Sequence, residues 1–112
     1  MAKLVPILFM LVLGACANIP NGCDHVDYSA VRSPLSSGAL MFSLTISEAA
    51  RKETVDGIPF KYVSKEWENL KKKVTDNSKL WYFSERFETM TGYVLIENCS
   101  ATEQVILKLN MM

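Results

Sequence analysis

The sequence contains little of what most catalytic sites are built from. It has one histidine, His25, three cysteines among its 112 residues, and five glycines that are scattered along the chain. A catalytic triad cannot be assembled around this single imidazole, and neither can a paired-histidine metal centre. No glycine-rich run is present that would cradle a phosphate. We therefore expect a protein that is not an enzyme and that carries no cofactor.

An excess of positive charge is also missing. Twelve Lys and Arg residues balance twelve Asp and Glu residues, and removing the first 15 residues leaves 11 basic and 12 acidic ones. Such a chain exerts no long-range attraction on a phosphate backbone. The charge balance therefore predicts no nucleic-acid partner.

The longest apolar run is too short to cross a membrane as a stable helix. It covers residues 4–13, after the single positive charge of Lys3, and it is followed by Gly14, Ala15 and Cys16. A spanning helix needs about 20 apolar residues. A charged start, a short apolar core and an exit of small residues are typical of a secretory signal.

The end of this run, Leu13-Gly14-Ala15-Cys16, resembles the lipobox of bacterial lipoproteins. The resemblance implies diacylglyceryl transfer to the Cys16 thiol, cleavage after Ala15 and acylation of the new amino terminus. It also implies a lipid anchor in the cell membrane. Ala17 is not the aspartate associated with inner-membrane retention, so in a Gram-negative cell we expect the outer membrane, facing the periplasm. A plain secretory signal and an uncleaved anchor are the alternatives.

The predicted organisation is a signal peptide at 1–15, a lipid anchor and tether at 16–38, and a single domain at 39–112. Cleavage would leave 97 residues, enough for one modest core. Residues 17–38 are rich in turn formers and show no period of 2 or 3.6, which favours an irregular lead-in. This part and the domain resemble no characterised family closely.

Two cysteines remain if Cys16 carries lipid. Thiols exported to an oxidising compartment are more often bridged than free, so we predict a disulfide between Cys23 and Cys99. The alternative is a metal site built from the polar run that Cys23 begins. Structural zinc sites usually bring a second pair of nitrogen or sulfur ligands, which this chain lacks, so we predict no metal. The side chains that this alternative would use are Cys23, Asp24, His25 and Asp27.

The globular part begins with an alternating stretch that predicts a strand at 39–47. Its large apolar residues, Leu40, Phe42, Leu44 and Ile46, would share one face. A short helix at 47–53 should follow, with Ser47 as its N-cap. Asp56-Gly57 predicts a turn, and residues 58–63 are predicted to form a short strand.

A second helix is predicted to begin at Ser64, with Trp67, Leu70 and Val74 on one face. Three runs rich in aromatic and β-branched residues follow, at 80–83, 92–96 and 105–109, and indicate an antiparallel meander. The first two runs are apolar on both faces. A helix should therefore cover one face of their sheet, and the N-terminal lead-in or a partner the other.

The fold class predicted is α+β: a small antiparallel sheet of about four to five strands, packed by one or two helices, after an N-terminal signal helix. The residues expected to be largely buried are Trp67, Leu70, Leu80, Tyr93, Leu95, Leu107 and Leu109.

Three consecutive lysines, Lys71, Lys72 and Lys73, end the second helix. They could contact anionic lipid headgroups, although lysines also suit the negative end of a helix dipole in water. With the anchor and the small domain, the sequence favours a membrane-anchored binding or interaction module that meets an envelope protein. A structural envelope component, or an inhibitor or hydrolase acting on envelope substrates, are the alternatives.

Overall fold

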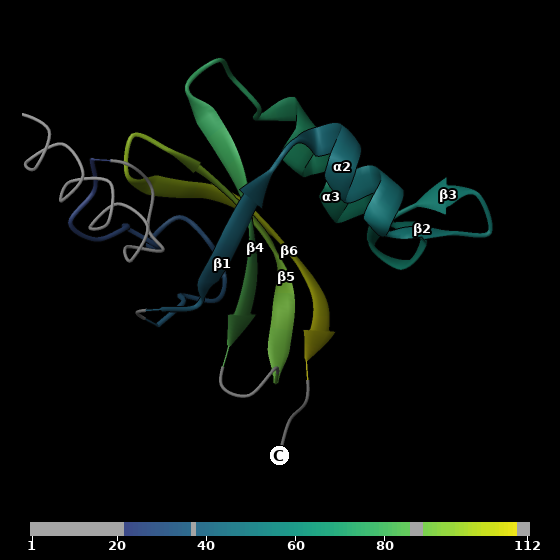
Figure 1. The fold of residues 1–112 in the computed structure, drawn as a ribbon, viewed down its shortest axis with the longest axis horizontal. Coiled ribbons are helices and arrows are strands. Elements are labelled where there is room, and N and C mark those ends of the chain that lie inside the picture. The colour runs from purple at the N-terminus through teal and green to yellow at the C-terminus, as the bar shows by residue number, and fades with distance from the viewer. Residues whose placement is uncertain (1–21, 37, 86–88, 110–112) are drawn as a thin grey trace, which may run out of the picture.

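The computed structural model describes residues 22–36, 38–85 and 89–109, with the side chain of Leu109 left out (Figure 1). The predicted signal peptide at 1–15 and Cys16 lie outside these residues. The elements are, in chain order, β1 (Leu40–Leu44), α2 (Ile46–Lys52), β2 (Thr54–Val55), β3 (Ile58–Pro59), the 3₁₀ turn η1 (Lys61–Val63), α3 (Ser64–Lys72), β4 (Ser78–Glu85), β5 (Met90–Glu97) and β6 (Ser100–Leu109).

The three C-terminal runs form the predicted meander. β4, β5 and β6 pair antiparallel in sequence order, and β1 joins the outer side of β4 to give the sheet order β1-β4-β5-β6. Asn98 and Cys99 connect β5 to β6 with φ angles of 52° and 64°. Positive φ at both central residues is what a two-residue type I′ hairpin requires. The α+β prediction is thus confirmed for the described residues, as a four-stranded antiparallel sheet, a two-stranded hairpin and two helices.

The strand β1 departs from the predicted alternation. Its register to β4 shifts between Leu40, which pairs with Phe83, and Phe42, which pairs with Tyr82. A bulge of this kind adds one residue to one strand and turns the following side chains to the other face. Leu40 therefore packs on the face opposite Leu44, and Phe42 is 42% exposed. The prediction that all four apolar residues share one face was wrong.

The helix α2 begins one residue earlier than predicted, and its N-cap lies two residues earlier. Its N-cap is Thr45, not Ser47: the Thr45 hydroxyl accepts from the Glu48 backbone N–H at 3.1 Å, and the Glu48 carboxylate accepts from the Thr45 N–H at 2.8 Å. This reciprocal pair is a capping box. Asp56-Gly57 forms the predicted turn, but the strand after it stops at Pro59. Phe60 ends that strand because its φ is 53°, in the left-handed region.

The helix α3 begins at Ser64, but the expectation from sequence that Ser64 caps it was wrong: the N-cap is Val63, and no side chain caps the helix. Trp67 and Leu70 are buried, and the Phe60 ring stacks on Trp67 with 3.9 Å between ring centroids. Val74 is 39% exposed because the helix ends at Lys72 and the chain turns away. The prediction of an apolar face therefore holds for its first two residues.

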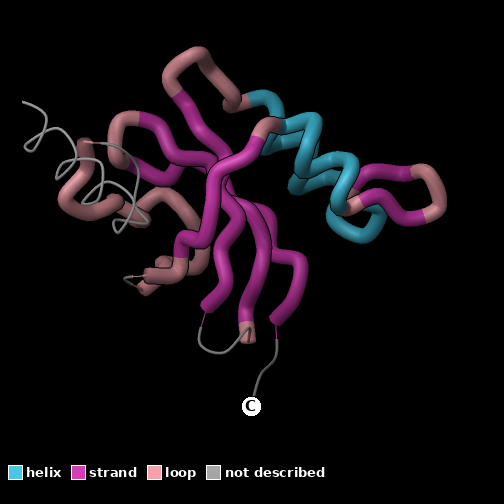
Figure 2. The backbone as a smooth tube through the Cα atoms, viewed as in Figure 1, coloured by secondary structure: helices cyan, strands magenta, loops and turns pink. Residues whose placement is uncertain are grey.

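The sheet carries one apolar cluster on each face, and both helices lie on the same side of it (Figure 2). The helix-side cluster contains five of the residues predicted to be buried and half-buried Leu107; Leu109 is outside the described side chains. Its fully enclosed members are Ala49, Phe60, Trp67, Leu70, Leu80, Tyr93, Leu95 and Val105.

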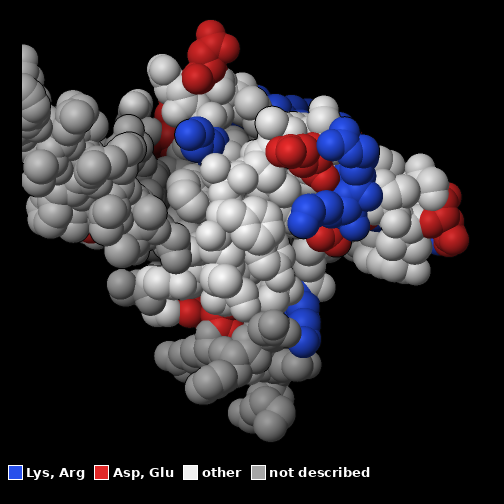
Figure 3. All heavy atoms as spheres, viewed as in Figure 1, with Lys and Arg blue, Asp and Glu red and all other residues white. Residues whose placement is uncertain are grey.

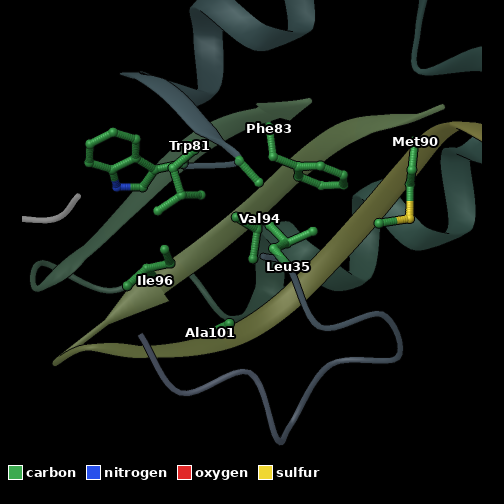
Figure 4. Packing of buried hydrophobic residues seen from close by; sticks show 9 residues of the cluster. Leu35, Trp81, Phe83, Met90, Val94, Ile96 and Ala101 are labelled. Atoms are coloured by element: carbon green, nitrogen blue, oxygen red, sulfur yellow. The ribbon is translucent and has the colours of Figure 1, made fainter. Parts of the chain in front are cut away.

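The opposite face is covered by the lead-in, which we define as residues 22–36. Leu35 lies beside Val94 over the strands (Figure 4), and Val26, Tyr28 and Val31 pack against the same cluster. This settles the alternative left open by the sequence, since a segment of the chain itself covers the second face. Residues predicted as part of a tether thus contribute to the core.

Candidate functional site

The disulfide predicted from the cysteine count is present. The sulfurs of Cys23 and Cys99 are bonded, with 5.6 Å between the Cα atoms and 76 positions between the two residues in sequence. Cys99 lies in the β5–β6 turn, and Cys23 is buried in the lead-in. The bond therefore fixes the start of the lead-in to one end of the sheet. The sulfur of Cys23, a candidate ligand in the metal alternative, is therefore not available as a thiolate.

Backbone pairing continues this attachment along β6. The Asp27 N–H donates to the Cys99 carbonyl at 2.9 Å, and the Ala101 N–H donates to the Asp27 carbonyl at 2.8 Å. The Asp27 carboxylate accepts from the Ser29 N–H at 2.9 Å, a bond that holds the pKa of Asp27 below its usual value. Asp27, a candidate ligand in the metal alternative, thus orders the lead-in. Across the described ranges, no three His, Cys, Asp or Glu side chains are placed to hold a metal ion.

Two buried polar side chains of the sheet bind the rest of the lead-in. Gln104 bonds the backbone of Ser33 through both ends of its amide. Glu85 accepts from the Ser36 N–H at 2.7 Å and from the Ser36 hydroxyl. Burial, and then the negative charge of Glu85, raise the pKa of Tyr28. Sequence reasoning did not single out Gln104, and it would treat Glu85 as a solvated charge in the link between two strands, whereas both side chains are buried.

The three lysines at the end of α3 are exposed, and two of them have local partners. The Lys71 ammonium lies 3.0 Å from the Glu68 carboxylate and 6.0 Å from the Trp67 ring centroid. Lys73 lies 3.8 Å from the Glu103 carboxylate, and Lys72 is exposed. Contact of Lys71, Lys72 and Lys73 with lipid headgroups stays a prediction.

A hollow lies beside the edge strand β1, and sequence reasoning did not find it. We call it the β1 groove; its volume is about 490 Å³ and its lining residues are Phe42, Ser43, Leu44, Glu48, Arg51 and Lys52. The Phe42 ring stacks on Tyr82 at 5.2 Å between centroids, and the Lys52 ammonium lies 5.1 Å from the Phe42 ring centroid. The alternating pattern had placed Phe42 on one face with three other apolar residues, and it gave no sign that the Phe42 side chain is exposed.

The charges in the β1 groove are mostly positive and unpaired. Of the ion pairs between described side chains, none includes Arg51 or Lys52. Glu48 is held by the capping box, and its bonds with Thr45 lower the pKa of its carboxyl. An aromatic ring, an apolar edge, two cations and the Glu48 carboxylate thus surround one open hollow.

A buried hydroxyl elsewhere has a structural role. The Tyr93 hydroxyl donates to the Glu53 carboxylate at 2.9 Å, which ties the end of α2 to β5. Burial and this bond raise the pKa of Tyr93 well above its usual value. The hydroxyl therefore stays protonated at ordinary pH and is unsuited to act as a base.

Comparison with protein-family models, with curated proteins and with solved structures finds no significant match. Neither helix within the described ranges is long and apolar enough to cross a membrane.

Proposed function

We propose that this chain is a bacterial lipoprotein, anchored through Cys16, whose domain serves as a small interaction module in the cell envelope. The observation that carries the proposal is the tetrapeptide Leu13-Gly14-Ala15-Cys16 at the end of a short apolar run. It is followed by a domain with an oxidised cysteine pair, which is usual outside the cytosol.

The disulfide also bears on Cys16 itself. The chain has three cysteines, and the other two are bonded to each other. The cysteine in the lipobox position therefore has no partner for a disulfide within the chain. The Cys16 thiol can therefore be modified by lipid without breaking or preventing a disulfide within the chain.

The disulfide also limits how far the domain can stand from a membrane. Between Cys16 and Cys23 only residues 17–22 separate the lipid from the folded part. Six residues span at most about 20 Å when fully extended. The domain would sit close to the lipid surface, where it meets partners that lie against the same membrane.

The interaction part of the proposal is supported by the β1 groove. Phe42 is 42% exposed on an edge strand and lines the groove together with Leu44 and the cations of α2. Apolar side chains gathered beside polar ones are common at protein interaction sites.

The experiment is metabolic labelling with a radiolabelled fatty acid in a bacterial host. We expect the wild type to take up label and Cys16→Ser to take up none and to accumulate as precursor or soluble protein. The matched control is Cys23→Ser/Cys99→Ser, which removes two thiols and leaves the lipobox intact, and it should be labelled. Equal labelling of the wild type and Cys16→Ser would refute the lipid anchor.

A further inference from the structure

The two edges of the sheet differ in how they are protected. The outer edge of β6 begins with the bridge between Asp27 and Ser100, and the strand carries the charged residues Glu103 and Lys108. The strand β1, Leu-Met-Phe-Ser-Leu, carries no charge and no proline. Charges, prolines, β-bulges and covering segments are the usual means by which proteins block an edge against further pairing. β1 has one of these, the bulge between Leu40 and Phe42, and its residues after the bulge carry no charge and no proline.

Among the described strands β1 pairs with β4 alone, so its outer side presents backbone groups without a strand partner. Exposed edges of this kind bind extended peptides by strand addition, where backbone bonds give affinity and flanking pockets select side chains. The β1 groove provides such a flanking pocket. The exposed face of Phe42 and the carbon chains of Arg51 and Lys52 line it.

The positive charge of Arg51 and Lys52 beside this edge favours an acidic peptide over a basic one. Figure 3 shows positive charge gathered over and beside α2, with acidic side chains next to it, and a broad uncharged surface over the strands. Within the described part of the chain Arg51 and Lys52 form no close ion pair; Glu48 is hydrogen-bonded to Thr45, and the charges of Arg51 and Lys52 add to the lowering of its pKa. A carboxylate on an added strand would therefore find two cations within the groove.

A second copy of this chain fits the same edge less well. In an antiparallel β1 pair related by a two-fold axis, both copies of α2 lie on the same face of the joined sheet. The Lys52 ammonium lies 5.1 Å from the Phe42 ring, near the middle of the five-residue strand. The axis would thus bring the cations of both copies together, and like charges in contact are unfavourable.

We propose that β1 binds an extended acidic peptide segment of a partner protein as a fifth strand of the sheet. The backbone of the segment pairs with the outer side of β1, and a glutamate or aspartate side chain meets Arg51 and Lys52. This proposal deepens the proposed function by assigning the surface and the chemistry of the partner. It does not require that Cys16 be acylated.

The test uses the full chain in non-ionic detergent and three fluorescent nine-residue peptides of alternating valine and threonine. One carries two central glutamates, one carries two lysines in their place, and one is the glutamate peptide with N-methyl groups on alternate amides. By fluorescence anisotropy, the glutamate peptide should bind at least about tenfold more tightly than the lysine peptide, since two exposed ion pairs become repulsions. The N-methylated peptide should not bind.

Matched variants locate the site. Arg51→Glu/Lys52→Glu should reverse the preference, so that the lysine peptide binds more tightly. Lys65→Glu/Lys72→Glu makes the same change of charge on exposed positions of α3 outside the groove, and should keep the original preference.

Three results would overturn the proposal. They are equal binding of the glutamate and lysine peptides, binding that survives N-methylation, and a free protein that is already dimeric by light scattering with slowly exchanging β1 amides. The last result would assign the edge to a second copy. Absence of peptide binding with normal fatty-acid labelling would reject this proposal alone, whereas loss of labelling with intact peptide binding would reject only the anchor.

Discussion

Gln104 binds the backbone of Ser33 through both ends of its side-chain amide. The amide nitrogen donates to the Ser33 carbonyl at 2.8 Å, and the amide oxygen accepts from the Ser33 N–H at 3.1 Å. The two residues are 71 positions apart, and Gln104 is buried. One side chain of β6 thus supplies hydrogen-bond partners for backbone groups of the lead-in beyond its bridge to β6 at Asp27, which is how a loop can cover a sheet face.

Replacing Gln104 with methionine tests this attachment, because methionine keeps most of the volume and removes both polar groups. Leaving two partly buried backbone groups unpaired should lower the free energy of unfolding by about 1–3 kcal/mol. Amide exchange should become faster in the lead-in and stay unchanged in α3. The control is Lys108→Met on the same strand, which is exposed and should change stability little. Equal stability of the two variants would contradict the role of Gln104.

Reduction of the disulfide should destabilise the domain strongly. Closing a loop of 76 residues restricts the unfolded chain, which is worth about 4 kcal/mol in the chain-entropy model. Urea unfolding with and without a reductant measures the change. The variant Cys23→Ser/Cys99→Ser should match the reduced wild type and be insensitive to the reductant. Identical midpoints for oxidised and reduced wild type would show that the bond contributes nothing.

Gly92→Ala should be destabilising although Gly92 lies in a strand. A Cβ atom at this position would lie 2.1 Å from the Val105 carbonyl oxygen and 3.0 Å from the Ile106 Cα, and backbone atoms cannot move aside cheaply. We expect a loss of about 1–3 kcal/mol from overpacking, measured by chemical unfolding. Ser84→Ala on the neighbouring strand is the control. A neutral Gly92→Ala would mean that β5 and β6 separate readily at the register shift beside Gly92.

The capping box of α2 predicts a pH dependence. Bonds with Thr45 lower the pKa of Glu48 from its ordinary value of 4.5, so the folded state favours the ionised carboxylate. This contribution is present above the pKa of the unfolded state and is lost as the pH falls through the lower pKa of the folded state. Thermal unfolding of the wild type and Glu48→Gln should therefore differ at pH 7, and the difference should vanish in acid. A constant difference across this range would contradict the assignment.

The parts of the fold predicted correctly are those that a local pattern determines. The meander follows from three dense β-rich runs, and the disulfide from the expectation that two cysteines remain in an exported chain. Trp67 and Leu70 were placed correctly because one helical period fixes their face.

The errors arise where a single residue changes the geometry. The bulge at β1 moves Leu40 to the other face, and an alternating pattern carries no sign of an inserted residue. Thr45 could have been found as the cap, because Thr45 and Glu48 have the spacing of a capping box, but Ser47 offered a competing hydroxyl. The β1 groove depends on the exposure of Phe42, which an alternating pattern does not reveal.

The central claim is that the mature chain begins at Cys16 and carries lipid there, and mass spectrometry of the protein purified from membranes tests it most directly. The account predicts an N-terminal peptide that starts at Cys16 and bears a diacylglyceryl group on sulfur and an acyl chain on the amino group. A peptide in which Ala15 is still joined to an unmodified Cys16 would contradict it.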